Sequence, residues 1–276
     1  AEAAHVSQPA LSAGVQELER ILGAPVVERA RGAVIMTAVG AEAVRRAEDV
    51  LARTEDLVEA AKNAGRLLSG RFRLGVIPTV APFLLPAKLP SVKAAYPSLK
   101  LFIREDLTPR LIAALKAGQI DAAVIALPYD APGIAHARIG DDEIMAAAPA
   151  DHALAAPGPI RPGSLRAEDL ILLEDGHCLR DHALAALDIE APRGDDVFAA
   201  TSLHTLVQMV GSGLGVSFLP KMAVQAGLAD TPSVAIRAFE NQADGAPPHR
   251  EIVVAWRAGS SRAAEARLLA EALKLE

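Results

Sequence analysis

The sequence predicts a mixed α/β chain, in which a winged helix-turn-helix unit and a linker helix precede a larger α/β domain of two lobes. Three features lead to this prediction. Short helix and strand signals follow one another over residues 1–40, a long helical pattern begins at residue 41, and strand–helix alternation begins at residue 70. The length of 276 residues suits about two domains.

The domain boundaries are placed at these changes of pattern. Residues 1–40 are assigned to the winged helix-turn-helix, 41–69 to a linker and dimerisation helix, and 70–276 to the two-lobed domain. Lobe I is expected to comprise residues 70–143 and 246–276, and lobe II residues 144–245. Because ligands bind beyond the carboxyl ends of the strands in such sheets, we expect a functional cleft between the lobes.

The first helix is expected over residues 8–22. Ser7 is a good N-cap, Pro9 lies in the first turn, and Gly23 follows the last turn, where glycine commonly ends a helix. Four apolar residues recur at helical spacing and should form one buried stripe: Leu11, Val15, Leu18 and Leu22. Two short strands around Arg31 and Gly32 would form the wing. Since the first four residues read as the tail of a helix, we expect this unit to be N-terminally incomplete.

The long helix from residue 41 carries an apolar seam. Its members recur at alternating intervals of three and four residues, as at the a and d positions of a coiled coil: Val44, Ala47, Leu51, Thr54, Val58 and Ala61. Two structures fit such a seam, a helix packed on its own unit and a helix paired with a second copy of the chain. We favour dimerisation because no segment nearby in the sequence offers an apolar partner.

From residue 70 the order of elements is βαβαβ, which predicts a parallel sheet with right-handed crossovers. The strands are RFRLGVIPT, LKLFIRE and IDAAVIAL, and the intervening helices are APFLLPAKLPSVKAAYP and PRLIAALKAG. A second set of strands and helices follows residue 143. The strand REIVVAWRAG and a final helix at 262–275 are expected to return to lobe I.

Charge alone does not point to a nucleic-acid partner. The formal net charge is −6, and residues 1–70 contain eight Lys or Arg against ten Asp or Glu, a net charge of −2. Nucleic-acid-binding domains usually present a basic surface. A DNA-binding prediction therefore depends on the residue pattern of the first unit, with basic side chains placed locally.

The chain has one cysteine, Cys178, so it can form no disulfide within itself and no cysteine-based metal site. The histidines show no metal-ligand spacing, and we expect no metal and no cofactor. A lone thiol suits a reducing cytoplasm. No apolar run approaches the roughly 18 residues of a membrane span and no signal peptide is recognisable, so we expect a cytoplasmic protein without a membrane partner.

The segment HVSQPALSAGVQELERILGAPVVERARGAVIMTAVG resembles the DNA-binding domain of LysR-type transcription regulators. Its most specific parts are Ser-Gln-Pro-Ala-Leu-Ser at residues 7–12, Leu18-Glu19, the Gly23 stop, and Thr37 to Gly40. The resemblance implies that the start of the helix at residue 8 lies in the major groove of double-stranded DNA.

The same resemblance implies which side chains meet DNA. Residues at the start of the recognition helix would lie near the base edges: Ser7, Gln8, Pro9 and Ser12. Gln8 could pair with adenine through two hydrogen bonds. The chain has Gln16 and Glu17 where the family often has basic residues, so phosphate contacts are expected mainly from Arg29 and Arg31.

Cys178 lies where the predicted strand LILLED passes through Gly176 and His177 into a helix. The positive end of a helix dipole favours a thiolate, and a neighbouring His or cation favours it further. From the spacing alone, two interpretations stay open. Cys178 is either a reactive thiol or a small apolar residue in a packed core, the commonest fate of a lone cysteine.

The string Gly-His-Cys-Leu-Arg-Asp at residues 176–181 resembles the hydrogen-peroxide-sensing OxyR branch of the LysR family. The resemblance extends over essentially the whole chain, through GVIPTVAPFLLP, IDAAVIAL and GLGVSFLP. It implies a two-lobed, periplasmic-binding-protein-like regulatory domain over residues 70–276. It also implies that Cys178 is the peroxidatic cysteine, which attacks peroxide as a thiolate and becomes a sulfenic acid.

The OxyR resemblance implies roles for five further residues around Cys178. His177 would tune the thiolate, Thr79 and Thr108 would hydrogen-bond peroxide or water, Asp181 would orient the site, and Arg250 would stabilise the anion. Without the resemblance, Thr79 is interpreted as an ordinary turn residue and Arg250 as a member of a surface salt bridge.

One departure from the OxyR pattern changes the implied mechanism. Members of this branch commonly carry a second, resolving cysteine nine residues after the first, and here that position is Leu187. The implied fates of oxidised Cys178 are a sulfenic acid, a mixed disulfide with a small thiol, a Cys178–Cys178 bond between subunits, and overoxidation. A natural single-cysteine branch and an engineered substitution would both explain Leu187.

The sequence therefore predicts a DNA-binding transcription regulator rather than an enzyme. The implied partners are promoter DNA, hydrogen peroxide and further copies of the chain in a homodimer or homotetramer, with RNA polymerase as an additional candidate. The main rival is a LysR-type regulator that binds a small metabolite in the cleft, with Cys178 not redox-active. A thiol peroxidase and a transport-type solute-binding protein are further rivals, and the helix-turn-helix start argues against both.

Overall fold

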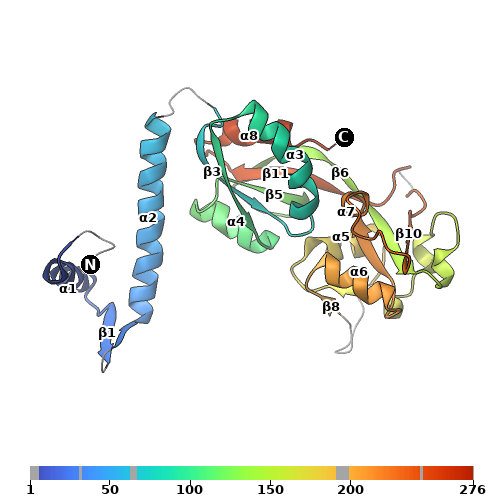
Figure 1. Ribbon diagram of the computed structural model, residues 1–276, viewed down its shortest axis with the longest axis horizontal. Helices are drawn as coiled ribbons and strands as arrows, with labels where there is room; N and C mark the ends of the chain where they lie inside the picture. Colours follow the sequence, from blue (N-terminus) through green and yellow to red (C-terminus); the bar gives the residue numbers. More distant parts are fainter. Residues whose placement is uncertain (1–5, 31–32, 63–66, 191–198, 243–244, 276) are drawn as a thin grey trace. The chain divides into compact units, whose positions relative to one another are not determined.

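The computed structural model describes residues 6–30, 33–62, 67–190, 199–242 and 245–275. Backbone contacts divide the chain into two compact units, Ala1–Lys62 and Asn63–Glu276 (Figure 1). Within the described ranges, every helix is too short or too polar to cross a bilayer.

The first unit contains a helix, a two-stranded hairpin and a long helix: α1 (Gln8–Leu22), β1 (Val27–Ala30), β2 (Ala33–Met36) and α2 (Ala38–Lys62). The predicted start and end of α1 are confirmed. The Ser7 hydroxyl accepts a hydrogen bond from the Ala10 N–H at 3.4 Å, and Gly23 has the left-handed φ of 68°. The predicted wing strands are antiparallel. Arg31 lies outside the described residues, as does the side chain of Arg29.

Several residues that carry the LysR resemblance join the elements of this unit. The Glu19 carboxylate accepts hydrogen bonds from the N–H groups of Val26 and Val27, at 2.8 and 3.3 Å. The Thr37 hydroxyl donates to the Pro25 carbonyl at 2.7 Å and accepts from the Gly40 N–H at 2.9 Å. These bonds fix the wing between the two helices, and Thr37 caps α2, which starts three residues before the predicted boundary.

The prediction of a buried stripe on α1 is wrong within this unit. Leu11, Leu18 and Leu22 are 40%, 43% and 44% exposed. The helical periodicity is correct, but the described segments of the unit do not cover this face. The seam residues Val44 and Leu51 on α2 are likewise exposed, at 42% and 63%.

The second unit is built around a mixed sheet. Its helices are α3 (Ala81–Ala95), α4 (Thr108–Ala117), α5 (Cys178–Ala186), α6 (Leu203–Gly211), α7 (Lys221–Gln225) and α8 (Ala263–Ala272). Its strands are β3 (Gly70–Val76), β4 (Leu99–Glu105), β5 (Ala122–Leu127), β6 (Ile134–Pro149), β7 (Leu172–Leu173), β8 (Ala199–Ala200), β9 (Ser217–Pro220), β10 (Val234–Arg237) and β11 (His249–Arg257). Short 3-10 turns cover Ala153–Ala155, Pro162–Ser164 and Ala167–Asp169.

The sheet follows the order β4-β3-β5-β11-β6-β10, with β9 also paired to β6. The predicted parallel pairing of β3 with β4 and β5 is confirmed. The chain moves from β3 outward to β4 and then back across β3 to β5. Right-handed crossovers in opposite directions place α3 and α4 on opposite faces of the sheet (Figure 1).

The long strand β6 was predicted only in its second half. Its first half pairs with β11, and residues 144–149 pair with β9 and β10. One core therefore lies around β3, β5, β11, α4 and α8, and it includes the single tryptophan, Trp256. Two further cores lie around the second half of β6. We refer to the core around β3, β5 and β11 as the first core.

Gly75 in the middle of β3 leaves no room for a side chain. A Cβ there would lie 2.6 Å from Leu111 and 2.8 Å from Ile120, both of which are buried. We predict that Gly75→Val lowers the free energy of unfolding of this unit by about 1–3 kcal/mol, the usual cost of overpacking a core. Denaturant titration followed by Trp256 fluorescence would measure it. Gly163→Ala is the control, because nothing lies within 4 Å of a Cβ there; equal midpoints for the two variants would contradict the prediction.

Candidate functional site

Cys178 is the first residue of α5 and follows a tight turn. The His177 N–H donates to the Glu174 carbonyl at 3.3 Å, and Gly176 has a φ of 93°, a left-handed conformation that favours glycine. Cys178 is a free, half-buried thiol that packs against the first core. The turn therefore places the thiol at the N-terminus of α5, on the side of the helix that packs against the first core.

The start of α5 lies beside the start of α4. A Cβ on Gly176 would come within 3.1 Å of Leu107, the residue that precedes α4. Thr108, the first residue of α4, is 1% exposed, and its hydroxyl oxygen has no hydrogen-bond partner among the described residues. A buried polar group without a partner costs about 1–3 kcal/mol. This hydroxyl is thus able to hydrogen-bond a small polar molecule.

Arg250, the second residue of β11, is held inside the protein at 1% exposure. Its Nε and Nη2 donate to Asp142 Oδ2 at 3.0 and 2.9 Å. Its Nη1 donates to the Thr79 hydroxyl at 2.7 Å, and Nη2 also donates to the Thr79 carbonyl at 3.1 Å. The other Asp142 oxygen accepts from the Met222 N–H at 3.0 Å.

These contacts change the interpretation of two residues. Arg250 is not part of a surface salt bridge, and Thr79 is more than a turn residue, because its hydroxyl and carbonyl both bind the buried guanidinium. Sequence reasoning missed Asp142, which is 3% exposed and balances the charge of Arg250. It lies in the middle of β6, directly before the apolar residues that the sequence assigns to a strand after residue 143. An acidic residue in such a position is a weak signal for a buried partner.

His182 lies one turn after Cys178, on the same face of α5. It is 8% exposed, and its Nε2 lies 3.1 Å from the Pro128 carbonyl, which can only accept a hydrogen bond. Nε2 must therefore carry the proton, so in the neutral ring Nδ1 is an acceptor. Nδ1 is buried and has no hydrogen-bond partner among the described residues. The sequence pattern alone did not single out this residue, because the histidines show no metal-ligand spacing.

Burial lowers the pKa of both histidines of this segment. For His177, burial is the main cause, and the negative charge of Glu174 opposes it. For His182, burial is again the main cause, and the hydrogen bond to Pro128 opposes it. The positive charge of Arg250 lowers the pKa of His182 further. Both rings are thus held preferentially neutral.

The remaining predicted site residues are placed as follows. Asp181 is exposed, and its role in orienting the site stays a prediction. Leu187, at the end of α5, is 4% exposed and packs in one of the cores around β6. It is separated from Cys178 by the nine-residue helix, a rise of about 13 Å. A disulfide needs Cα atoms about 4.4–6.8 Å apart, so a thiol here could reach Cys178 only if α5 unwound.

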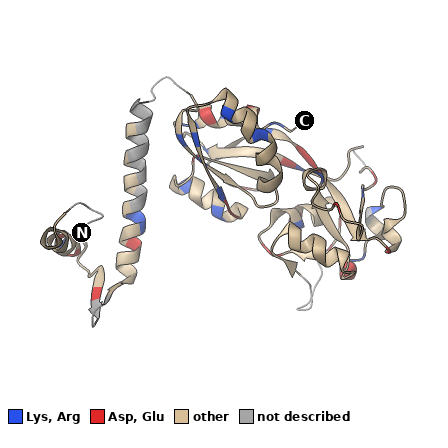
Figure 2. Ribbon diagram, viewed as in Figure 1, with Lys and Arg blue, Asp and Glu red and all other residues tan. Residues whose placement is uncertain are grey.

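The predicted DNA-contacting residues lie at the start of α1. Gln8 and Pro9 are exposed, as is Ser7, and Ser12 is half-buried. Charge on this unit is mixed rather than basic. The one basic residue of α1, Arg20, pairs with Glu17 at 2.5 Å. Residues of both signs lie on α2 (Figure 2), where Arg46 pairs with Glu42 at 2.6 Å.

Across the ranges that the structure describes, no three His, Cys, Asp or Glu side chains are grouped closely enough to hold a metal ion. The polar groups on or next to α4, α5, β3 and β11 are instead two hydroxyls, two imidazoles and one guanidinium. They are Thr79, Thr108, His177, His182 and Arg250.

Comparison with known proteins assigns both units. Residues 1–41 match the bacterial regulatory helix-turn-helix family of LysR type, and residues 65–276 match the LysR substrate-binding domain. The chain is 40% identical, over 99% of its length and 87% of the relative's, to a probable hydrogen peroxide-inducible genes activator of Streptomyces viridosporus. It is 34% identical to the DNA-binding transcriptional dual regulator OxyR of Escherichia coli K12, over 99% and 88% of the two chains.

A solved structure shows the same relationship. A cysteine-206 mutant of Corynebacterium glutamicum OxyR, bound to hydrogen peroxide, is 35% identical and superposes with a TM-score of 0.70 over 98% of this chain and 85% of that one. The helix-turn-helix match and the substrate-binding-domain match together span nearly the whole sequence. The chain belongs to the LysR family of DNA-binding transcription regulators, and its relatives within that family include OxyR proteins.

Proposed function

We propose that this protein is a transcription regulator that senses hydrogen peroxide through oxidation of Cys178, without an intramolecular disulfide. The observation that carries the proposal is the surroundings of the thiol. Cys178 begins a helix and packs on the core that contains β11, while the unpartnered Thr108 hydroxyl and the buried Arg250–Thr79 pair come from neighbouring elements. The similarity to hydrogen peroxide-inducible activators supports the same function.

The chemistry uses the polar groups around the thiol. The Cys178 thiolate attacks one peroxide oxygen, an S–O bond forms and the O–O bond breaks. The second oxygen departs as hydroxide and takes up a proton to become water. Cys178 is then a sulfenic acid. Hydroxyls of Thr79 and Thr108 hydrogen-bond the peroxide, and the positive charge of Arg250 stabilises the departing anion.

Oxidised Cys178 has no second thiol in the chain to react with. The sulfenic acid therefore persists, forms a mixed disulfide with a small thiol, bonds to Cys178 of another subunit, or is oxidised further. The added oxygen is polar and enters a half-buried, well-packed position. It shifts residues 178–187 between two packings, and this movement changes the spacing of the DNA-binding units.

The DNA-binding part of the proposal rests on α1 and α2. Ser7, Gln8, Pro9 and Ser12 contact base edges or phosphates of promoter DNA, and Arg29 and Arg31 contact phosphates. The exposed apolar seam of α2 pairs with a second copy of the chain, in a homodimer or in a homotetramer. The protein acts in the cytoplasm, where the DNA is, and RNA polymerase is a further partner.

The domain division follows the same scheme. Residues 1–40 form the DNA-binding domain, 41–69 the linker, and 70–276 the regulatory domain. Lobe I, of residues 70–143 and 246–276, has the first core, and lobe II, of residues 144–245, has the cores around the second half of β6.

We predict that Cys178→Ser removes the peroxide-dependent change in DNA binding and leaves binding without peroxide intact, because serine keeps the helix start but cannot be oxidised. Gel-shift titration with and without peroxide measures this. Met209→Leu is a matched control that removes another oxidisable sulfur, in a different core. A peroxide response that survived in the serine variant would remove Cys178 as the sensor and favour a regulator of metabolite type.

We also predict a stability change with pH that depends on His182. Because its pKa is lowered in the folded protein, the folded state binds a proton less readily than the unfolded chain. The stability that this gives is present above the unfolded pKa of about 6.5 and is lost as the pH falls below it. His177 contributes with the same sign.

Thermal unfolding between about pH 5 and 8 tests this prediction, since imidazoles titrate in that range. His182→Gln keeps a donor for the Pro128 carbonyl but does not titrate, so its melting temperature should fall less on acidification than that of the wild type. His204→Gln is the control because His204 is exposed. If both variants followed the wild-type pH profile, burial of His182 would not be the cause.

A further inference from the structure

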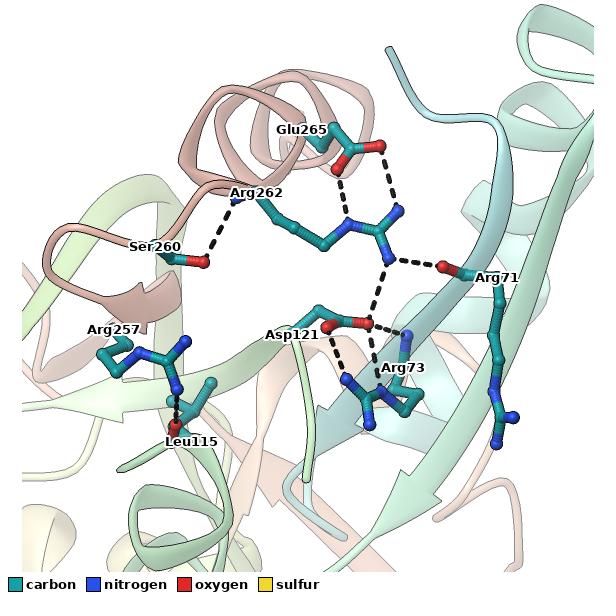
Figure 3. A network of polar contacts seen from close by, with 8 residues as sticks. All are labelled: Arg71, Arg73, Leu115, Asp121, Arg257, Ser260, Arg262 and Glu265. Atoms are coloured by element: carbon teal, nitrogen blue, oxygen red, sulfur yellow. Dashed lines mark hydrogen bonds and ion pairs between the residues drawn. The ribbon is translucent and has the colours of Figure 1, made fainter. Parts of the chain in front are cut away.

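A second arginine network lies where the chain first joins the regulatory unit (Figure 3). Arg262, directly before α8, forms a two-pronged ion pair with Glu265, with Nε to Oε2 at 2.6 Å and Nη2 to Oε1 at 3.0 Å. Its Nη1 donates to the Arg71 carbonyl at 2.5 Å and lies 3.5 Å from Asp121 Oδ2. Arg262 thus joins α8 to the starts of β3 and β5.

Asp121 closes the network from the other side. It accepts from the Arg73 backbone N–H at 2.7 Å and from Arg73 Nη2 at 3.0 Å, while its own N–H donates to the Arg73 carbonyl at 2.8 Å. The side chains of Asp121 and Arg73 are only 7% and 11% exposed. Partly buried, two-pronged pairs of this kind have a defined geometry, unlike most exposed salt bridges.

The segment that enters the unit is held by the same group. The Leu68 N–H donates to Glu265 Oε1 at 3.2 Å. Leu68 has the left-handed φ of 52°, a conformation that costs a residue with a Cβ about 1–2 kcal/mol. Its side chain is 1% exposed in the first core. The backbone here is fixed in an unfavourable conformation, which requires contacts such as the one with Glu265 to maintain it.

Two strands connect this network with the thiol site. β3 contains Arg71, which belongs to the network, and leads to Thr79. β11 contains Arg250 as its second residue and ends shortly before Arg262. Arg250 binds Thr79 near one end of these two strands, and Arg262 binds the Arg71 carbonyl near the other end. β5 lies between them in the sheet. The seven residues of β3 span about 23 Å, so the two arginine contacts hold opposite ends of the sheet formed by β3, β5 and β11.

We propose that Glu265 and Arg262 are positioning residues, which lock residues 68–73 to α8 so that movement at the Cys178 site is passed to the linker through β3 and β11. The inference rests on the proposed function. Without the lock, Cys178 reacts as before, but the chain between the regulatory unit and α2 no longer follows the change. Loss of the network is therefore expected to abolish the change in DNA binding without affecting the oxidation of Cys178.

The test uses the full chain with Glu265→Gln and Arg262→Lys, which remove the two-pronged ion pair while preserving size or charge. Glu271→Gln is the matched control on the same helix, because Glu271 pairs with Lys274 in an exposed position. Two quantities are measured after one equivalent of peroxide. One is the rate of Cys178 oxidation by intact mass, and the other is the change in footprint on a duplex selected by the wild-type protein from a randomised pool.

Both network variants are expected to oxidise at the wild-type rate and to lose the peroxide-dependent change in footprint, while Glu271→Gln behaves like the wild type in both respects. A wild-type footprint change in both network variants would overturn the inference. If the wild-type protein itself showed no oxidation of Cys178, or no footprint change, the proposed function would fail instead.

Hydrogen exchange of the wild-type protein adds a test that does not depend on the folding of a variant. The Leu68 amide and its neighbours up to Arg73 should exchange slowly in both the reduced and the oxidised protein, because a joint that transmits movement must stay closed. Rapid exchange of the Leu68 amide in either state would overturn the inference.

Discussion

The buried charge of Arg250 is the constraint on which the regulatory unit depends. A guanidinium inside a protein requires a nearby anion and a partner for most of its N–H groups. Asp142 supplies the charge and Thr79 supplies two oxygen atoms. The same aspartate accepts from the Met222 N–H. Four segments, just after β3, in the middle of β6 and at the starts of β11 and α7, are therefore held around one cation. Removing either charge would leave the other buried and unpaired, which typically costs about 3–5 kcal/mol.

This constraint also sets the chemical character of the thiol site. Arg250 adds to burial in keeping His182 neutral, and the Pro128 carbonyl fixes the proton of that ring on Nε2. Among the described residues, the Thr108 hydroxyl and His182 Nδ1 are buried without hydrogen-bond partners, and in the proposed site they accompany the guanidinium of Arg250, which is paired with Asp142. Such a site suits a small, neutral molecule that can donate and accept hydrogen bonds. Hydrogen peroxide has this chemistry, and so does water.

Most of the architecture could be predicted from the sequence, because local signals specify it. Ser7 and Gly23 bound α1, and apolar strands between helices gave the parallel β3–β4–β5 arrangement. Features that depend on distant partners could not be predicted. The first half of β6 is recognisable only through its pairing with β11, and Asp142 has meaning only once Arg250, 108 positions later, lies against it. For the same reason the predicted burial of the apolar stripe on α1 was wrong, because helical periodicity identifies an apolar face but not the segment that covers it.

We propose that Cys178 reacts with peroxide, and no second thiol in the chain is there to capture the product. Intact mass should be measured after one equivalent of peroxide, with and without a low-molecular-weight thiol. Cys178 is expected to gain one oxygen atom, which is replaced by one adduct of the small thiol when that thiol is present. An unmodified Cys178 under both conditions, or oxygen found only on methionine, would contradict it.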